Sequence, residues 1–538
     1  MKLNYKRTLL VGFAFFLICM FWQAYDTVMP LILTNKFGMA QTWSGAIMAL
    51  DNVLALFMLP FFGALSDKCA AKRGKRTPFI IIGTVLAAVL FIGLSLFDAR
   101  QLAKVEGVAP EDQAKYEQSL SVIYDADPEI SVKGDKKDGM SFGEAVKDVF
   151  SDGKKQKLSE IFPEKSSFTS IKMFKLDENG EPTKNVTDDY TNYVVPARNA
   201  YAWQKTVESP ATLVFFILLL LAVLISMGIF RSPAVALMPD VTPKPLRSKA
   251  NAVINLMGSF GGILVLVLGM IFKTGAASNA LMSYIPFFCT ISALMIVSLI
   301  VFVTTVKEPK WASEADKIND ALDDEPEEEK KTDRKLTKEE KRSLIFILIS
   351  VALWFMGYNA VSSKYSVYAG SILGKDYNLT LIVGQGAAIL SYLPIGIISS
   401  KIGRKKAIMT GVVMLTAVFV LASFLRSDSS IILMNILFAF AGIAWATINV
   451  NSYPMVVELA TGSNVGKYTG YYYTASMAAQ VITPVLSGIF LDITLYTLFP
   501  YAALFTAIAF ITMLNVKHGD SKPQVKKSLL ENFDVDGD

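Results

Sequence analysis

Twelve long apolar segments leave this sequence few folds to adopt. Each contains about 20 mostly apolar residues, the length that a helix needs to cross the hydrocarbon core of a bilayer. Backbone N–H and C=O groups find no water in that core, so the segments are predicted to be helices. The composition supports an all-α membrane protein, since 52% of the 538 residues are hydrophobic and 18% are charged. The expected helices span residues 8–34, 44–66, 77–97, 209–238, 248–272, 282–306, 343–369, 379–400, 406–425, 429–452, 468–492 and 497–516.

Loop charge predicts the topology. Basic residues crowd the loops at 68–76, 244–249 and 401–406, whereas the alternate loops carry few charges, Lys36 and Lys273 among them. Positively charged loops remain in the cytoplasm, so these loops and, with twelve crossings, both termini are expected inside. The first segment is too long for the apolar part of a cleavable signal, and we expect it to remain as the first crossing. The basic patches are interpreted as topology signals, and no nucleic-acid partner is expected.

The sequence repeats itself between its two halves. A basic turn follows the second segment at 63–78, and a shorter copy follows the eighth at 396–406. The ends of the fourth and tenth segments, at 228–240 and 442–458, also share a Gly at entry, a Pro at exit and an acid after the Pro. This duplication predicts two pseudo-symmetric six-helix bundles.

Two polar stretches interrupt the helices. The stretch 98–208 falls between the third and fourth helices and is predicted to be a folded extracytoplasmic insertion, with a helix that starts near a capping box at Ser141–Glu144. It could serve as a lid or docking element, or be an insertion without a role. The acidic stretch 307–342 is predicted to be a solvated tether between the bundles. The insertion's expected core consists of Phe150, Ile161, Phe162, Phe168, Ile171, Phe174, Tyr190, Tyr193 and Tyr201.

These features divide the chain into six parts. The N-terminal bundle contributes helices one to three and then four to six, on either side of the insertion. The C-terminal bundle contributes helices seven to twelve, and a polar tail ends the chain. The expected boundaries are 1–97, 98–208, 209–306, 307–342, 343–516 and 517–538.

The basic turn after the second helix resembles the signature loop of the major facilitator superfamily, which Gly63, Asp67, Gly74 and Arg76 fit. The longer runs 67–80 and 231–252 resemble the plant sucrose transporters and their animal and bacterial, glycoside–pentoside–hexuronide-like relatives. The resemblance implies two bundles around a central cavity. It also implies import of a disaccharide or related glycoside with a cation, most often a proton, by alternating access.

The resemblance is incomplete at three places. Where the plant proteins carry an Arg, this chain has Val235, and Arg231 lies one turn earlier. Melibiose-permease-like relatives carry two carboxylates deep in the second helix, where this chain has Asp51 alone, nearer the outer end. The insertion is not part of the common pattern. Both the sugar and the coupling ion, proton or sodium, therefore stay open.

Ionisable residues inside membrane helices indicate function, because a charge in the bilayer is costly. Asp26 shares a helical face with Gln23 and Pro30 and could accept sugar hydroxyls or a coupling proton. Its alternative role is a structural acid in a polar helix junction. Asp51, beside Asn52, is either a second coupling carboxylate or an acid at a helix end.

Further polar residues complete the predicted site. Arg231 could hold the sugar or pair with a coupling acid, or it could pair with Asp240 at the cytoplasmic end. Aromatic rings suit the apolar face of a sugar and amides suit its hydroxyls, although each such residue could instead join two helices. The predicted substrate-binding residues are Gln23, Asp26, Asn52, Arg231, Asn255, Tyr358, Asn359 and Gln385, with Trp445 as a similar candidate.

A charge network is predicted at the cytoplasmic loop. Asp67, Arg73, Arg76 and Asp240 are expected to form a latch that stabilises the outward-open state. The alternative interpretation is a set of topology signals and helix caps.

Other chemistry finds little support. The cysteines, Cys19, Cys69 and Cys289, lie in or beside membrane segments, and His518 is the single histidine, so neither a disulfide framework nor a Cys/His metal site is expected. No cofactor is expected, and no motif indicates an enzyme. We expect a monomer in a bacterial plasma membrane. Two alternatives remain open: proton-coupled efflux of a drug or metabolite, and a sugar sensor that uses the insertion without net transport.

Overall fold

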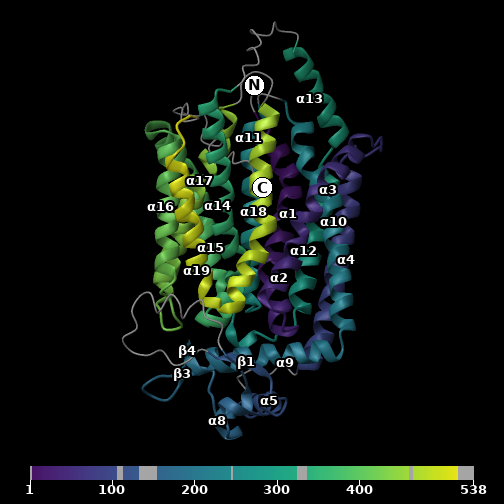
Figure 1. The fold of residues 1–538 in the computed structure, drawn as a ribbon. Coiled ribbons are helices and arrows are strands. Elements are labelled where there is room, and N and C mark those ends of the chain that lie inside the picture. Colours follow the sequence, from purple (N-terminus) through teal and green to yellow (C-terminus); the bar gives the residue numbers. More distant parts are fainter. Residues whose placement is uncertain are drawn as a thin grey trace.

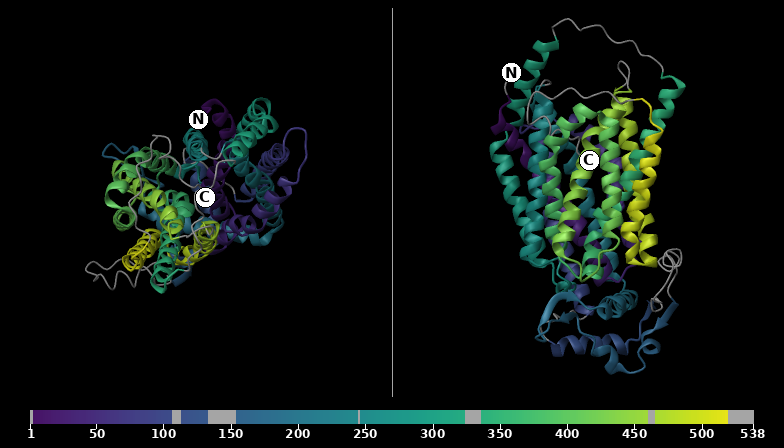
Figure 2. Two further views of the ribbon diagram at one scale, coloured as in Figure 1. Left: turned by 90° about the horizontal axis from the view of Figure 1, so that it is seen from above. Right: turned by 90° about the vertical axis from the view of Figure 1, so that its left-hand side faces the viewer.

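The computed structural model describes residues 3–105, 113–132, 154–243, 246–323, 336–459 and 465–518. Its long helices form two bundles that stand side by side, one from each half of the chain (Figures 1 and 2). Eleven helices of the described residues are long and apolar enough to cross a membrane. The remaining expected segment, 379–400, is helical as α15 (Tyr377–Ile402) and lies in the C-terminal bundle, but it is not among these eleven.

The helices extend beyond most of the predicted segments. Helix α4, for example, continues to Val105, past the predicted end at residue 97. The N-terminal bundle contains α1 (Tyr5–Leu31) with the π-helical turn η1 (Ile32–Lys36), α2 (Gln41–Met48), α3 (Leu50–Asp67), α4 (Thr77–Val105), α10 (Ala211–Val241), α11 (Arg247–Ile271) and α12 (Ile285–Thr305). The C-terminal bundle contains α14 (Lys338–Tyr368) with the π-helical turn η5 (Ala369–Leu373), α15, α16 (Arg404–Ala422), α17 (Ile431–Val457), α18 (Val465–Ile493) and α19 (Leu498–Leu514).

Helix pairing repeats between the two halves. Helix α1 packs on α11 as α14 packs on α18, and α4 packs on α10 as α16 packs on α17. The pair α3 and α10 likewise corresponds to α15 and α17. Each bundle has its own hydrophobic core. This correspondence agrees with the duplication predicted from the sequence.

The insertion is folded around a small core of its own and lies at one end of the bundles, called here the insertion end (Figure 1). Of the expected core residues, Phe168, Ile171, Tyr190 and Tyr201 are buried in it. The expected helix start at Ser141 and the core candidate Phe150 lie outside the described residues. Its elements are α5 (Gln113–Asp125), β1 (Glu129–Val132), β2 (Lys154–Lys157), α7 (Leu158–Ile161), α8 (Lys165–Thr169), β3 (Phe174–Leu176), β4 (Pro182–Val186), η2 (Tyr190–Val194) and α9 (Val195–Glu208), with β1 antiparallel to β2 and β3 antiparallel to β4.

Buried polar contacts join the insertion to the N-terminal bundle. Lys36 at the end of η1 forms an ion pair with Asp98 of α4, with Nζ to Oδ distances of 2.6 and 2.7 Å, and neither side chain is exposed. Beside this pair, Gln101 Nε2 donates to the Lys36 carbonyl at 3.1 Å and to Thr206 Oγ1 of α9 at 2.9 Å. Lys36, expected to be a loop charge, is therefore part of a buried joint.

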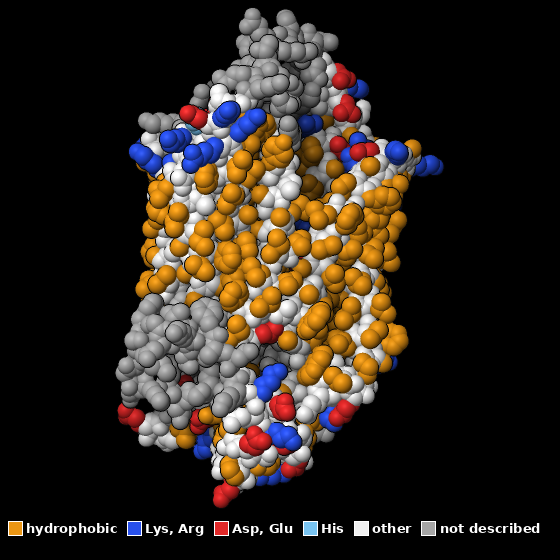
Figure 3. Space-filling view, in the orientation of Figure 1, with side chains coloured by type: hydrophobic (Ala, Val, Ile, Leu, Met, Phe, Trp, Pro, Cys, Tyr) orange, Lys and Arg blue, Asp and Glu red, His pale blue; other side chains and the backbone are white. Residues whose placement is uncertain are grey.

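The opposite end, called here the linker end, carries the chain's basic loops. On the face shown in Figure 3, Lys and Arg side chains gather there, while hydrophobic side chains cover the long helices. The expected tether begins with a helix, α13 (Glu308–Asp323), which packs against α10. Trp311 of this helix belongs to the N-terminal core, with the Arg7 guanidinium 5.3 Å from its ring. The first part of the stretch is thus docked rather than solvated.

Candidate functional site

Two acids and one arginine come together in the N-terminal bundle. Asp26 on α1, Asp51 on α3 and Arg231 on α10 interact electrostatically with one another. Asn52 Nδ2 donates to Asp51 Oδ1 at 2.7 Å, and the Arg231 guanidinium lies 5.5 Å from the ring centre of Trp22. All of these side chains are half-buried. The carboxylates of this cluster can therefore accept hydrogen bonds from the hydroxyl groups of a ligand, or can bind a proton.

Arg231 belongs to this cluster and not to the linker end. Its alternative partner, Asp240, instead accepts from Arg76 Nε at 2.7 Å and lies 3.5 Å from Lys75 Nζ. The structural alternative for Arg231 is therefore wrong in this structure.

The C-terminal bundle contributes amides and stacked rings. Gln385 Nε2 on α15 donates to Gln23 Oε1 on α1 at 2.6 Å, which brings this face of α1 directly against the other bundle. Tyr358 stacks on Trp445 with ring centroids 3.7 Å apart and an angle of 4° between the rings. Among the described residues, Asn359 Nδ2 has no hydrogen-bond partner. The C-terminal bundle therefore places one of two stacked aromatic rings next in sequence to a buried, unsatisfied donor.

The remaining predicted binding residue is Asn255. It is half-buried on α11, and its backbone carbonyl accepts from Ser259 Oγ at 3.1 Å. Because α11 packs on α1 and α15, Asn255 lies on a helix that borders both bundles.

Three of the four predicted latch residues meet at the linker end. Arg76 is 4% exposed and donates through Nε to Asp240, through Nη2 to Asp67 and through Nη1 to Ser66 Oγ. Burial opposes its charge, but the hydrogen bonds and charges of Asp240 and Asp67 raise the pKa of Arg76 above its usual value. Arg73 is exposed and has no ion-pair or hydrogen-bond partner among the described residues, so the structure does not bring it into the latch.

An acid that the sequence pattern does not single out lies beside these predicted latch residues. Glu308, only 2% exposed, accepts from the backbone N–H groups of Arg76 and Thr77, each at 2.8 Å, and from Thr77 Oγ1 at 2.7 Å. It thereby caps the start of α4 from the far end of the N-terminal half. In the C-terminal half, Arg404 Nη1 pairs with Glu458 at the corresponding place.

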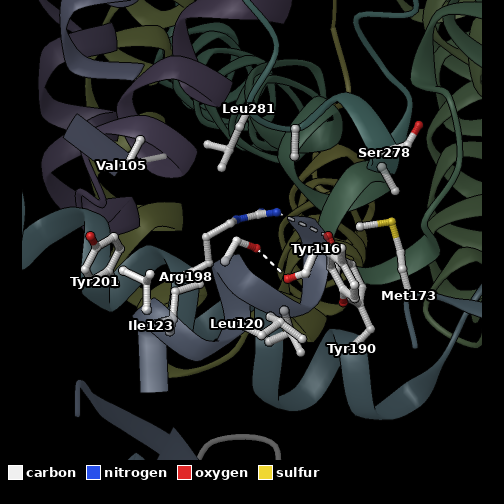
Figure 4. Close-up of a pocket in the computed structure, with 15 residues that line it drawn as sticks. Val105, Tyr116, Leu120, Ile123, Met173, Tyr190, Arg198, Tyr201, Ser278 and Leu281 are labelled. Atoms are coloured by element: carbon white, nitrogen blue, oxygen red, sulfur yellow. Dashed lines mark hydrogen bonds between the residues drawn. The ribbon is translucent and has the colours of Figure 1, made fainter. Parts of the chain in front are cut away.

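A separate small cavity of about 40 Å³ lies at the insertion end, between α5, α9 and residues 277–281 (Figure 4). Arg198 reaches into it and donates to the Tyr190 hydroxyl at 3.1 Å (Figure 4). None of the predicted site residues lines this cavity. Within the described part of the chain, no three His, Cys, Asp or Glu side chains are grouped so as to hold a metal, and the cysteines are unpaired.

A family model matches most of this chain, whereas the curated relatives match a short part of it. A family model described as the MFS_1 like family matches residues 21–479. A sucrose transport protein from Arabidopsis thaliana, SUC3, is 38% identical over 68 residues, which are 12% of this chain and 11% of that protein.

Solved structures extend the similarity to the whole fold. A D-xylose-proton symporter has a TM-score of 0.53 at 15% identity, covering 96% of this chain and 99% of its own. A peptide transporter, POT, has the same TM-score of 0.53 at 11% identity, covering 95% and 93%. The fold therefore does not indicate whether the substrate is a sugar or a peptide.

Proposed function

The chain belongs to the MFS_1 like family of membrane transporters, and from this premise we propose that it imports a disaccharide or related glycoside together with a proton. The observation that carries the proposal is the acid–arginine cluster of the N-terminal bundle, whose Asp26 lies on the same helix as Gln23, which is hydrogen-bonded to Gln385 of the other bundle. Asp26, Asp51 and Arg231 supply charged acceptors and donors, and the Tyr358–Trp445 stack supplies a flat apolar surface. A pyranose offers both a rim of hydroxyl groups and an apolar face. The local similarity to a sucrose transport protein supports the same substrate class.

The acid cluster also supports proton coupling. Asp26 is the single acid of α1, and Asp51 is the single acid of α3 before its last residue, Asp67, which favours protonation over a dedicated sodium cage. Two neighbouring carboxylates beside one guanidinium can instead exchange a proton, because protonation of Asp26 changes how many negative charges Arg231 must balance. The similarity in fold to a D-xylose-proton symporter agrees with this coupling.

We place the linker end in the cytoplasm and the insertion outside a bacterial plasma membrane. The basic loops at the linker end support this orientation. With α15 as the twelfth crossing, both termini face the cytoplasm and the monomer alternates between access from each side. Gln23 and Gln385 then join the two walls of the binding site.

The decisive experiment measures transport by purified protein in proteoliposomes. Counterflow of radiolabelled disaccharides identifies the substrate without a driving force, and uptake under an inward pH gradient reports coupling. Asp26→Asn should abolish accumulation against a gradient while counterflow continues, and the exposed Asp316→Asn serves as the matched control.

The same assay separates the alternatives. Normal gradient-driven accumulation by Asp26→Asn would refute the coupling role of Asp26. Substrate loss from the vesicles driven by the pH gradient would establish efflux. Binding without counterflow would establish a sensor.

A further inference from the structure

The two bundles touch closely at the insertion end through α2 and α18. Gly45 of α2 lies against the backbone of Pro484, and Gly488 of α18 lies against the backbone of Gln41 and Thr42, so that a Cβ at either glycine would collide with backbone atoms. Small residues thus allow the two helices to approach at backbone distance. This contact joins the two bundles at the insertion end.

The start of α2 is capped from the opposite bundle. The first N–H groups of a helix have no partner within it, and Ala40, at the N-cap position, has no side chain that could accept from them. Asp492 of α18 accepts instead from the backbone N–H groups of Gln41 and Thr42, the latter at 2.9 Å, and from Thr42 Oγ1 at 2.5 Å. A carboxylate at this position is also favoured by the helix dipole.

A buried lysine of the C-terminal bundle binds the same turn. Lys364 of α14 is 0% exposed, and its ammonium lies 3.1 Å from the Gln41 carbonyl, 3.3 Å from Gln41 Oε1 and 3.4 Å from Ser44 Oγ. All three acceptors belong to α2, in the other bundle. Asp492 also acts electrostatically on this ammonium. If the Lys364 ammonium lost these acceptors and stayed buried in the membrane helix, its charge would be strongly disfavoured.

We infer that Lys364 and Asp492 are positioning residues that hold the insertion end closed by binding the first turn of α2. An interaction shifts a conformational equilibrium only if it differs between the two states. These contacts join different bundles, so they exist when the insertion end is closed and are lost when the bundles separate there. The inference needs a transporter that opens at this end, but it does not depend on which solute or ion is carried.

The test measures the width of the insertion end directly. Spin labels at Leu96→Cys on α4 and Phe424→Cys beyond α16, both exposed side chains of opposite bundles, report that width by pulsed electron paramagnetic resonance. The native cysteines are replaced in this background. Hydrogen bonds to charged groups contribute enough that Lys364→Met should raise the ratio of open to closed populations about tenfold. Asp492→Ala, at an exposed side chain, should act in the same direction by a smaller factor, and Lys364→Arg should restore part of the closed population.

The controls separate a gating role from a structural one. Asp428→Asn alters another exposed acid at the insertion end and should leave the distances unchanged. Thr42→Val removes one hydrogen bond to Asp492 and is a milder change, so it can be measured even if Lys364→Met fails to fold. It should slightly widen the distribution of distances between the spin labels. Unchanged distances in Lys364→Met or Asp492→Ala, with or without a loss of thermal stability, would overturn the inference. Because no substrate is added, the result is independent of the sugar and proton assays.

Discussion

Glu308 caps helix α4 by accepting from the backbone N–H of Thr77 at 2.8 Å and from its hydroxyl at 2.7 Å. The carboxylate comes from the segment after α12, so the two ends of the N-terminal half are joined at the basic loop. Because Glu308 opens α13, the same contact also fixes where the connection to the C-terminal half begins.

Removal of this cap should destabilise the protein. Glu308→Ala takes away the acceptor for two backbone N–H groups at a helix N-terminus, and loss of a cap costs about 1–2 kcal/mol. We expect a lower thermal midpoint for the purified protein in detergent, with a smaller decrease for Glu308→Gln. The exposed ion pair between Glu314 and Arg7 provides the control, because Glu314→Ala should change the midpoint little. Equal effects of both alanine variants would contradict the capping role.

The latch should depend on Arg76 and not on Arg73. Arg76 uses three separate nitrogens for Asp240, Asp67 and Ser66, and a lysine cannot reproduce that geometry. Arg76→Lys should therefore reduce the maximal uptake rate roughly tenfold. Arg73→Gln, at an exposed side chain, should transport normally. A severe defect in Arg73→Gln with normal transport in Arg76→Lys would reverse this assignment.

The buried pair of Lys36 and Asp98 should show strong coupling in a double-mutant cycle. Asp98→Asn leaves an ammonium buried without its counter-charge, and breaking such a pair costs about 3–5 kcal/mol. The double variant Lys36→Met/Asp98→Leu should cost less than the two single changes added together. Thermal unfolding of the four proteins measures the difference. Simple additivity would mean that the two charges do not act as a pair.

The aromatic stack should contribute to sugar affinity. Trp445→Leu removes one of the two stacked rings on which we propose that the apolar face of the sugar lies. If the sugar contact is as strong as a contact between aromatic rings, about 0.5–1.5 kcal/mol, the half-saturation concentration should rise about threefold to tenfold. Trp203→Leu, at a tryptophan that is 43% exposed on α9 of the insertion, should leave that concentration unchanged. An unaltered half-saturation value in Trp445→Leu would place the sugar elsewhere.

The sequence predicted those features that have a local or repeated signature. The length of the apolar segments predicted the helices, and the repeated basic turns predicted two similar bundles. The residues Asp67, Arg76 and Asp240 could be grouped because the family pattern brings them together. Arg73 could not be separated from Arg76 in this way, since both are cations of one basic loop and only the fold buries one of them.

The missed residues depend on contacts between distant segments. Lys364 is a single cation in an apolar stretch, and its partners are a backbone carbonyl, an amide and a hydroxyl of α2, which carry no charge pattern. Glu308 lies in a charged stretch whose sequence predicts a solvated tether. Asp98 follows the predicted end of its helix, and its pairing with Lys36 becomes visible only when α4 is seen to continue.

The insertion contacts both bundles, and the two contacts differ in their chemistry. This difference affects where a nanobody should bind. Thr206 and Gln101 tie it to the N-terminal bundle through buried hydrogen bonds, whereas Val186 of β4 meets the C-terminal bundle by apolar packing against Gly374. Movement of one bundle relative to the other would alter this second attachment, so a nanobody bound beside it should bind the states of the transport cycle unequally. One raised against α5 and α8 would bind throughout the cycle and provide a rigid fiducial for imaging the other states.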